Sequence, residues 1–321
     1  MKYIGVDIGG TEVKLGIIDE RGKVLSSGNC SASFDQYETP ILDTVIKSLD
    51  IFLADHSKTS GEFAGIGVSA TGQIDIHNGV VAGTAGHIKN WQGSRIKETL
   101  ENRYGLPVTV MNDANCAALA EKWIGAAKDA SEAIVVTIGT GVGGGIIINS
   151  EILAGHNGFA GELGHFSICN EGRKCTCKNT GCYEQYASTT ALVHMVEEAV
   201  ENGLIDKNSF DTKRINGKTI FEQLKKFNSG LPQIVDEWLD YVADGLVSLV
   251  HIFNPQLILL GGGVSVQEKY FIEPIRRKVL ERVMPAFRNN LDIQSARLGN
   301  DAGMVGAVYY FIKCGKKQDT L

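Results

Sequence analysis

Several features of specialised proteins are missing from this sequence of 321 residues. No apolar run reaches the roughly 20 residues that a membrane-spanning helix needs. The first residues, MKYIGVDIGG, follow a strand pattern and lack the regions of a signal peptide, so we expect a cytoplasmic protein. Lys and Arg total 31 against 37 Asp and Glu, which leaves no basic surplus for coating nucleic acid. We therefore expect neither a membrane nor a nucleic acid as a partner.

Cysteine is scattered, except in one short segment. The chain has seven cysteines, an odd number that cannot pair completely, and a reducing compartment disfavours disulfides. Isolated cysteines such as Cys30, Cys116, Cys169 and Cys314 are most often small buried hydrophobic residues. The other three gather between positions 175 and 182.

The composition is that of a globular protein, with 43% hydrophobic and 21% charged residues. Strand-like runs at Lys2–Ile8, Glu12–Asp19 and Ala133–Ile138 alternate with helical patterns such as Leu231–Phe253. This alternation predicts an α/β protein. A chain of this length has room for two domains, each with its own core.

We expect the two domains to divide near residue 118. Residues 1–118 would form a small N-terminal α/β domain, and residues 119–300 a larger α/β domain. The amphipathic segment at about 301–315 is expected to form a final helix that packs back on the first domain.

Two glycine-rich segments, residues 7–11 (DIGGT) and 139–145 (GTGVGGG), each join one strand pattern to another. Glycines let the backbone approach a phosphate closely and point several N–H groups at it. Either segment alone fits a tight hairpin without a ligand equally well. Two such segments, each with Thr or Asp beside the glycines, favour phosphate binding.

The second segment also fits the dinucleotide fingerprint GxGxxG through Gly139, Gly141 and Gly144, with Glu162 near the position of a ribose-binding acid. That motif requires a helix to begin at its last glycine. Here β-branched residues follow, which are typical of a strand. The P-loop pattern is absent too, so we expect hairpins to hold any nucleotide.

A metal-binding pattern follows in the second half of the chain. His165 is followed by Cys175, Cys177 and Cys182. One imidazole and three thiolates make a closed tetrahedral Zn²⁺ site, which is structural because it leaves no open position. Chance clustering or a redox pair are the alternatives.

Motifs from end to end make the chain resemble the ROK family of bacterial sugar kinases and repressors. They are DIGGT (7–11), NDANCAALAE (112–121), GTGVGGGI (139–146), GELGH (161–165), CTCKNTGCYE (175–184) and LLGGGVS (259–265). The resemblance implies a two-domain hexokinase–actin-like (ribonuclease H-like) ATPase fold. Family repressors carry a DNA-binding segment before the first hairpin, whereas here Asp7 comes almost at once, which favours the kinase branch.

The implied activity is ATP-dependent phosphorylation of a hexose hydroxyl, in the first place the 6-OH of glucose. N-acetylmannosamine or another modified hexose is the alternative substrate. A non-catalytic sugar-sensing regulator would lack Asp113 or a phosphate hairpin, and neither is missing. Many family members are dimers, so a homodimer is expected by analogy alone.

The resemblance also implies a role for each motif residue. Asp113 matches the general base that takes the proton from the sugar hydroxyl, while Asn112 or Asp113 could cap the following helix. The sugar would be bound by Asn112, Asp113, Glu162, His165, Glu184 and Gly72. ATP would be bound by Gly9, Gly10, Thr11, Gly139, Thr140, Gly141, Gly261, Gly262 and Gly263, with Asp7 near Mg²⁺.

The loop between His165 and Glu184, here called the zinc loop, would serve the sugar site indirectly. His165 would give one ring nitrogen to zinc and the other to the sugar, and the loop would also place Glu184. Both phosphate hairpins lie outside this loop in the sequence. Loss of zinc is therefore expected to weaken sugar affinity more than nucleotide affinity.

The chain departs from the family pattern at two places. Lys178 stands where the family usually has glycine, which leaves the backbone of the zinc loop open to a different conformation. Residues 69–73 (SATGQ) replace a Pro-Gly pattern common among glucose-specific members and lean toward N-acetylmannosamine. Residues 121–126 and the GELGH motif resemble the glucose enzymes, so we lead with glucose.

Overall fold

A computed structural model of the chain describes residues 1–33, 35–56, 63–84, 88–210, 214–226 and 230–318. The chain divides into two compact units. Unit 1 comprises Met1–Asp129, Gly145–Gly161 and Leu298–Leu321, and unit 2 comprises Ala130–Gly144 and Glu162–Arg297. The expected domains, 1–118 and 119–300, differ from these units at residues 119–129, 145–161 and 298–300.

Unit 1 is built on a five-stranded mixed sheet with the order β3-β2-β1-β4-β7. β1 pairs antiparallel with β2 and parallel with β4, which in turn pairs parallel with β7. The first two strands begin and end where the sequence predicts. The bounds are β1 (Lys2–Ile8), β2 (Glu12–Asp19), β3 (Val24–Ser31), β4 (Phe63–Ala70) and β7 (Val108–Asn112).

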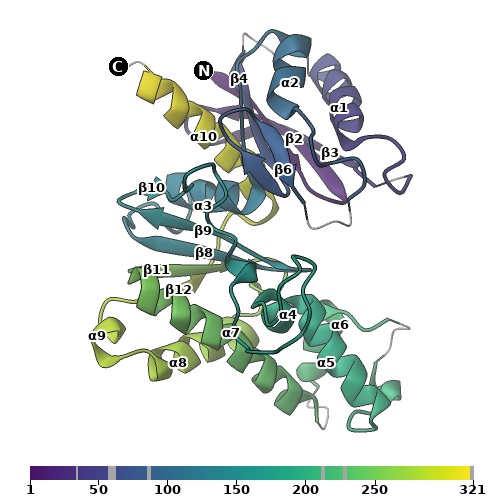
Figure 1. Cartoon of the computed structure of the whole chain (residues 1–321), viewed down its shortest axis with the longest axis vertical. Coiled ribbons are helices and arrows are strands. Elements are labelled where there is room, and N and C mark those ends of the chain that lie inside the picture. The colour runs from purple at the N-terminus through teal and green to yellow at the C-terminus, as the bar shows by residue number, and fades with distance from the viewer. Residues whose placement is uncertain (34, 57–62, 85–87, 211–213, 227–229, 319–321) are drawn as a thin grey trace. The chain divides into compact units, whose positions relative to one another are not determined.

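Helices pack on the sheet of unit 1, and a small hairpin completes the unit (Figure 1). The helices are α1 (Ile41–Asp55), α2 (Ile96–Tyr104), α3 (Asp113–Trp123) and α10 (Ala302–Gln318), with a short 3-10 turn at Gly299–Asp301. The hairpin is formed by β5 (Gln73–Asp75) and β6 (Val80–Gly83). The predicted C-terminal helix is thus present, and it packs against α3 and β4 within unit 1.

The two faces of this sheet are filled differently because side chains alternate along a strand. Ile4 and Val6 point into an apolar core that also contains residues of α1 and α2. On the other face, a Cβ on Gly67 would overlap the carbonyl oxygen of Ala307. The absence of a side chain at Gly67 therefore lets the backbone of α10 lie against β4.

Unit 2 contains most of a second five-stranded sheet with the order β10-β9-β8-β11-β12. β11 pairs parallel with both β8 and β12, while β10 pairs antiparallel with the end of β9. The bounds are β8 (Ala133–Ile138), β9 (Val142–Ile148), β10 (Glu151–Ile152), β11 (Leu257–Gly261) and β12 (Asp292–Ser295). β8 has the predicted bounds.

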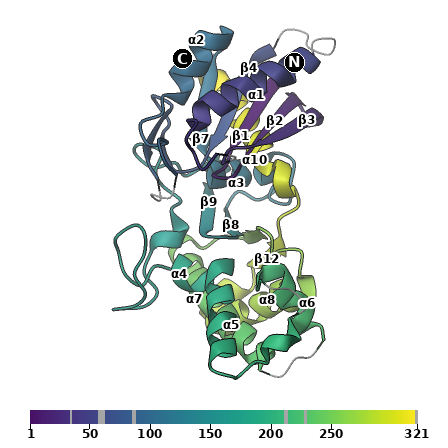
Figure 2. The same ribbon diagram turned by 90° about the vertical axis from the view of Figure 1, so that its right-hand side faces the viewer.

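The helices of unit 2 gather around α7, which begins and ends where the sequence predicts (Figure 2). α7 packs against α4, α5, α6 and α8. The α-helices are α4 (Glu184–Ala187), α5 (Thr189–Glu201), α6 (Gly217–Leu224), α7 (Leu231–Phe253), α8 (Glu273–Arg282) and α9 (Pro285–Arg288). Shorter turns lie at Leu163–His165, Lys207–Ser209 and Glu268–Ile272. Among the described residues, no helix combines the length and apolarity needed to cross a membrane.

Candidate functional site

The first glycine-rich segment forms the turn between β1 and β2, as predicted. The Gly9 N–H donates a hydrogen bond to the Glu12 carbonyl oxygen at 2.9 Å. The Tyr37 hydroxyl donates to the Gly10 carbonyl oxygen at 2.6 Å and so holds the turn from outside. Thr11 is exposed at the tip.

Asp7 lies beside this turn with only 16% of its side chain exposed. The Ser69 hydroxyl on β4 donates to Asp7 Oδ1 at 2.6 Å, and Lys14 Nζ stands 3.8 Å from Asp7 Oδ2. Burial raises the pKa of Asp7, although the Ser69 hydrogen bond and the Lys14 charge act in the opposite direction. A carboxylate in this position is a suitable ligand for a hard cation such as Mg²⁺.

The start of α3 is fixed by the two residues that the sequence places there. The Asn112 side chain caps the helix, because its Oδ1 accepts from the Ala114 and Asn115 N–H groups at 3.0 and 3.2 Å. Asp113 Oδ1 accepts from Asn112 Nδ2 at 3.0 Å and from the Ala114 N–H at 2.8 Å. The predicted cap is thus present, and Asn112 supplies it.

Gly72 joins this group through its backbone. It has a φ of 102°, which glycine adopts readily, and its carbonyl oxygen accepts from Asn112 Nδ2 at 3.0 Å. Unit 1 therefore brings together Gly72, Asn112 and Asp113 at the ends of β4 and β7.

The second glycine-rich segment turns between β8 and β9, again as predicted. The Gly139 N–H donates to the Gly141 carbonyl oxygen at 2.9 Å. The LLGGGVS segment reaches the same part of unit 2, because Gly261 pairs with Thr137 of β8. The third glycine of that segment, Gly263, then faces a cavity shared with the hairpin.

This cavity of about 850 Å³ has Gly139, Thr140 and Gly263 in its wall. It is large enough for a nucleotide, since small-molecule sites typically have volumes of about 300–1,000 Å³. Its other lining residues come mainly from α5, the start of α6 and the segment after β11. They are Thr189, Thr190, Val193, His194, Glu197, Arg214, Ile215, Asn216, Gly217, Lys218, Phe221, Val264, Val266 and Gln267.

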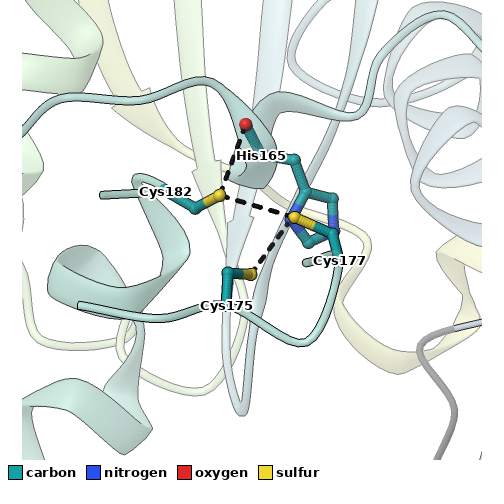
Figure 3. Close-up of side chains that lie close together, drawn as sticks. All are labelled: His165, Cys175, Cys177 and Cys182. Atoms are coloured by element: carbon teal, nitrogen blue, oxygen red, sulfur yellow. Dashed lines mark hydrogen bonds between the residues drawn. The ribbon is translucent and has the colours of Figure 1, made fainter. Parts of the chain in front are cut away.

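Four candidate metal ligands gather on the predicted zinc loop (Figure 3). The donor atoms of His165, Cys175, Cys177 and Cys182 all lie within 4.8 Å of one another. The sulfurs of Cys177 and Cys182 are 3.6 Å apart, and Cys175 Sγ is 3.6 Å from His165 Nδ1. With Zn–S distances of about 2.3 Å, tetrahedral geometry puts sulfurs about 3.8 Å apart, so the donor set fits Zn²⁺ in chemistry and spacing.

The thiols of this cluster perturb one another. Burial raises the pKa of Cys182 to about 12, and hydrogen bonds with the neighbouring thiols add to the shift. Burial acts in the same direction on Cys175, but hydrogen bonds from Cys177 and other neighbours outweigh it, and the pKa falls to about 7. Adjacent thiols do not all ionise to thiolates unless a positive charge compensates them, and a divalent cation would supply that charge.

Lys178 in this loop has a φ of 75°, the left-handed conformation that glycine favours. Its N–H donates to the Cys175 carbonyl oxygen at 3.0 Å, which closes the turn between the ligands. Lys178 therefore has the backbone conformation that glycine favours.

Beside the cluster, Glu162 lies next to His165, and Glu184 is near enough to Glu162 to act on it electrostatically. With Nδ1 directed at Cys175, His165 turns Nε2 toward Glu162, whose Oε2 is 3.9 Å away. Partial burial raises the pKa of Glu162; the His165 charge opposes this shift, and the Glu184 carboxylate adds to it. The two ring nitrogens of His165 therefore point at different groups, Nδ1 at the Cys175 thiol and Nε2 at the Glu162 carboxylate.

Glu184 also contacts the glycine hairpin. The Val142 N–H donates to Glu184 Oε2 at 3.0 Å. The second hairpin lies outside the zinc loop in the sequence, but in space it contacts the glutamate at the end of that loop. The expectation that zinc loss weakens sugar affinity more than nucleotide affinity stays a prediction, and the Glu184 contact is a route by which the nucleotide site would also be affected.

The ROK family model matches residues 3–313, nearly the whole chain. The chain belongs to the ROK family. The resemblance carried by the motifs is thereby confirmed. A curated member of similar length, a glucokinase of Halalkalibacterium halodurans, is 33% identical over 310 residues, which cover 95% of this chain and 93% of that protein.

Solved ROK structures share the fold. The ROK family glucokinase from Streptomyces griseus, in complex with glucose and AMPPNP, matches with a TM-score of 0.80 at 32% identity and covers 96% of this chain and 98% of that one. A putative N-acetylmannosamine kinase from Listeria monocytogenes matches with a TM-score of 0.80 at 29% identity, covering 98% and 99%. The predicted α/β, hexokinase–actin-like ATPase fold is confirmed.

Within each unit, the ROK motif residues converge. In unit 1, Asp7 and the 9–11 turn lie at the end of β1, and the Gly72–Asn112–Asp113 group at the ends of β4 and β7. In unit 2, the second hairpin, the 261–263 turn and the zinc loop with its acids lie at the ends of β8 and β11.

The motifs did not lead to Lys14 or to the threonines of α5. Lys14 pairs with Asp7 in the β1–β2 register. A tight turn after Ile8 pairs Ile8 with Val13, and the next antiparallel pair is then Asp7 with Lys14. The Thr190 hydroxyl donates to the Thr140 carbonyl oxygen at 2.8 Å, a contact for which the sequence carries no signal.

Proposed function

We propose that this protein is an ATP-dependent kinase that transfers the γ-phosphoryl group to a hexose hydroxyl, the 6-OH of glucose. The observation that carries the proposal is the cavity of about 850 Å³ in unit 2, lined by both the Gly139–Thr140 hairpin and Gly263. Family relatives support the sugar half of the reaction, since they include glucokinases and a structure in complex with glucose and AMPPNP.

Asp113 is the proposed general base. Its Oδ1 is held by Asn112 Nδ2 and by the Ala114 N–H, so the carboxylate is oriented before the sugar arrives. Because Asn112 supplies the cap of α3, we assign the Asp113 carboxylate to proton transfer from the attacking hydroxyl. The additional role of Asn112 and Gly72 as direct sugar ligands stays a prediction.

Phosphoryl transfer depends chiefly on positioning and on neutralising charge. The two hairpins, at Gly9, Gly10, Thr11, Gly139, Thr140 and Gly141, would hold the phosphates, and Gly261, Gly262 and Gly263 the adenosine. Mg²⁺, when bound, supplies the neutralising charge. Asp7 would hold it, and the Ser69 hydroxyl fixes one oxygen of that carboxylate.

Glu162, His165 and Glu184 would bind the sugar hydroxyls from unit 2. Zn²⁺ on His165, Cys175, Cys177 and Cys182 would supply the cross-link that orders this loop. With Nδ1 on the metal side, the His165 ring has its tautomer and orientation fixed, and Nε2 is presented beside Glu162.

A modified hexose is the second candidate substrate. The Thr71-Gly72 pair stands where glucose-specific members commonly carry Pro-Gly. The similar structure from Listeria monocytogenes, a putative N-acetylmannosamine kinase, supports the same alternative.

The deciding experiment is ATP turnover against a panel of glucose, mannose, N-acetylglucosamine and N-acetylmannosamine, with ADP release measured for each. Glucose should give the highest kcat/KM. A preference for N-acetylmannosamine would move the assignment to the second candidate. Sugar binding without any ADP release would instead identify a regulator. Sedimentation of the same preparation tests the homodimer that analogy predicts.

A further inference from the structure

One continuous segment, residues 182–190, holds the second glycine hairpin at three points. The Glu184 carboxylate accepts from the Val142 N–H at 3.0 Å. Five and six residues later, the Thr189 N–H donates to the Gly139 carbonyl oxygen at 2.8 Å, and the Thr190 hydroxyl donates to the Thr140 carbonyl oxygen at 2.8 Å. These three hydrogen bonds therefore hold the hairpin backbone at Gly139, Thr140 and Val142.

The segment that carries Glu184 is itself firmly anchored. Before it, the Tyr183 hydroxyl donates to the Val242 carbonyl oxygen of α7 at 2.7 Å. After it, the Ser188 carbonyl oxygen accepts from the Trp238 indole N–H at 3.1 Å. Both anchoring rings are fully buried, so the segment is a rigid support rather than a surface loop.

The zinc loop contacts the same short helix, α4. The Arg173 guanidinium donates to the Gln185 carbonyl oxygen at 2.8 Å and lies 4.7 Å from the centre of the Tyr186 ring. The Gln185 side-chain amide donates to Cys175 Sγ at 3.6 Å. The metal cluster and the hairpin therefore share one support, and Glu184 stands between them.

Glu184 fits the hairpin so closely that a Cβ added at Gly141 would overlap its Oε2. At Gly139, two residues earlier, an added Cβ would meet nothing within 4 Å. Neither glycine has a positive φ, so alanine is free of backbone strain at both positions. The two alanine substitutions therefore differ in whether the added methyl group meets the Glu184 carboxylate.

We infer that Glu184 is a positioning residue for the phosphate hairpin as well as a sugar ligand, so that one carboxylate couples the sugar and nucleotide sites. The sugar half rests on the proposed function, whereas the hairpin half rests on the contacts of Glu184 alone. A sugar that hydrogen-bonds to Glu184 would hold it in the conformation that orders the hairpin. Linkage then requires each ligand to strengthen the binding of the other by the same factor.

The first experiment needs no ligand. Amide hydrogen exchange across residues 139–145 is compared between the unaltered protein, Glu184→Ala and Glu184→Gln, all loaded with zinc. Glu184→Ala removes the acceptor of the Val142 N–H, and exchange in the hairpin should rise about 10-fold. Glu184→Gln keeps an acceptor oxygen and should restore most of the protection. Equal exchange in all three proteins would overturn the inference.

The second measurement is AMPPNP affinity by calorimetry without sugar. Glu184→Ala should bind AMPPNP about 10-fold more weakly, the loss typical of one hydrogen bond to a charged group. Glu162→Ala is the matched control, because that carboxylate faces His165 instead of the hairpin, and its AMPPNP affinity should stay unchanged. Equal effects of the two variants would overturn the inference. If the unaltered protein failed to bind AMPPNP, the proposed function would fall, while the exchange experiment would still decide the role of Glu184.

The third measurement alters the hairpin instead of Glu184. Glucose affinity is determined without nucleotide for Gly141→Ala and Gly139→Ala. Gly141→Ala displaces the Glu184 carboxylate and should weaken glucose binding about 10-fold, whereas Gly139→Ala should leave it unchanged. Unchanged glucose affinity in Gly141→Ala would overturn the coupling.

Discussion

Lys14 lies directly opposite Asp7 across the antiparallel β1–β2 pair, and its Nζ is 3.8 Å from the Asp7 carboxylate. The same ammonium group donates to the Asn300 carbonyl oxygen at 3.2 Å, so its position is fixed from two sides. A carboxylate that is mostly buried is costly unless it is paired. Lys14 and Ser69 together compensate Asp7 and hold it beside the first glycine turn.

Replacing Lys14 by Met keeps the length of the side chain and removes its charge. We expect the free energy of unfolding to fall by about 1–2 kcal/mol, because Asp7 keeps its burial and loses part of its compensation. The KM for Mg-ATP should rise several-fold because the carboxylate is no longer held in place. Urea unfolding and initial rates check both effects. Lys23→Met, at an exposed position, is the control, and identical behaviour of the two variants would contradict the role of Lys14.

Asp113→Asn should lower kcat by roughly 10²–10⁴, the usual contribution of a general base. The fold should persist, because the cap of α3 is supplied by Asn112. Thermal unfolding and single-turnover phosphorylation test the two parts separately. A variant that kept most of its kcat would show that Asp113 only orders the start of the helix.

Helix α10 offers a test of the packing in unit 1. A Cβ on Gly306 would overlap the Cys116 carbonyl oxygen of α3, whereas a Cβ on Gly315 would meet open space. Gly306→Ala should therefore lower the free energy of unfolding by about 1–3 kcal/mol or more through overpacking. Gly315→Ala should raise it by up to about 1 kcal/mol through helix propensity. Denaturant unfolding of both variants gives the comparison, and effects of the same sign would contradict the close approach of α10 and α3.

The sequence predicted elements well where the periodicity was long or strong. Helix α7 has 23 residues with a continuous apolar face, and both of its ends were predicted. Helix α2 was missed because only Ile96 and Leu100 are buried in nine residues, which is too weak a pattern to stand out from a polar loop. The short strands β5 and β12 have three and four residues and carry almost no periodicity.

The sequence likewise predicts some features of the candidate site and not others. Residues predicted to act through backbone turns or metal ligation, such as those of the zinc loop, are visible in the sequence because their spacing is local. The contact of Glu184 with Val142 spans 42 positions and depends on how α4 packs. No spacing rule predicts such a contact, so its meaning for the hairpin emerged only from the structure.

Purified protein should contain about one zinc per chain, as a closed site of one histidine and three cysteines implies. Metal analysis of reduced, freshly prepared protein tests this. Cys177→Ser should lose most of the metal, whereas Cys169→Ser should keep it, because Cys169 is outside the cluster of donor atoms. Zinc-free unaltered protein would contradict the site.

Loss of the metal should weaken the binding of both glucose and AMPPNP, and glucose binding should be weakened more. In Cys177→Ser, His165 loses the constraint on its ring, and the loop that contacts α4 through Gln185 loosens. Glucose affinity should fall about 10-fold or more, since charge-assisted hydrogen bonds contribute about 1.5–3 kcal/mol each. AMPPNP affinity should fall too, but less, because Thr189 and Thr190 still hold the hairpin. Calorimetry with each ligand alone measures the two losses, and circular dichroism confirms folding. An unchanged AMPPNP affinity would mean that the anchors on α7 hold Glu184 without help from the metal.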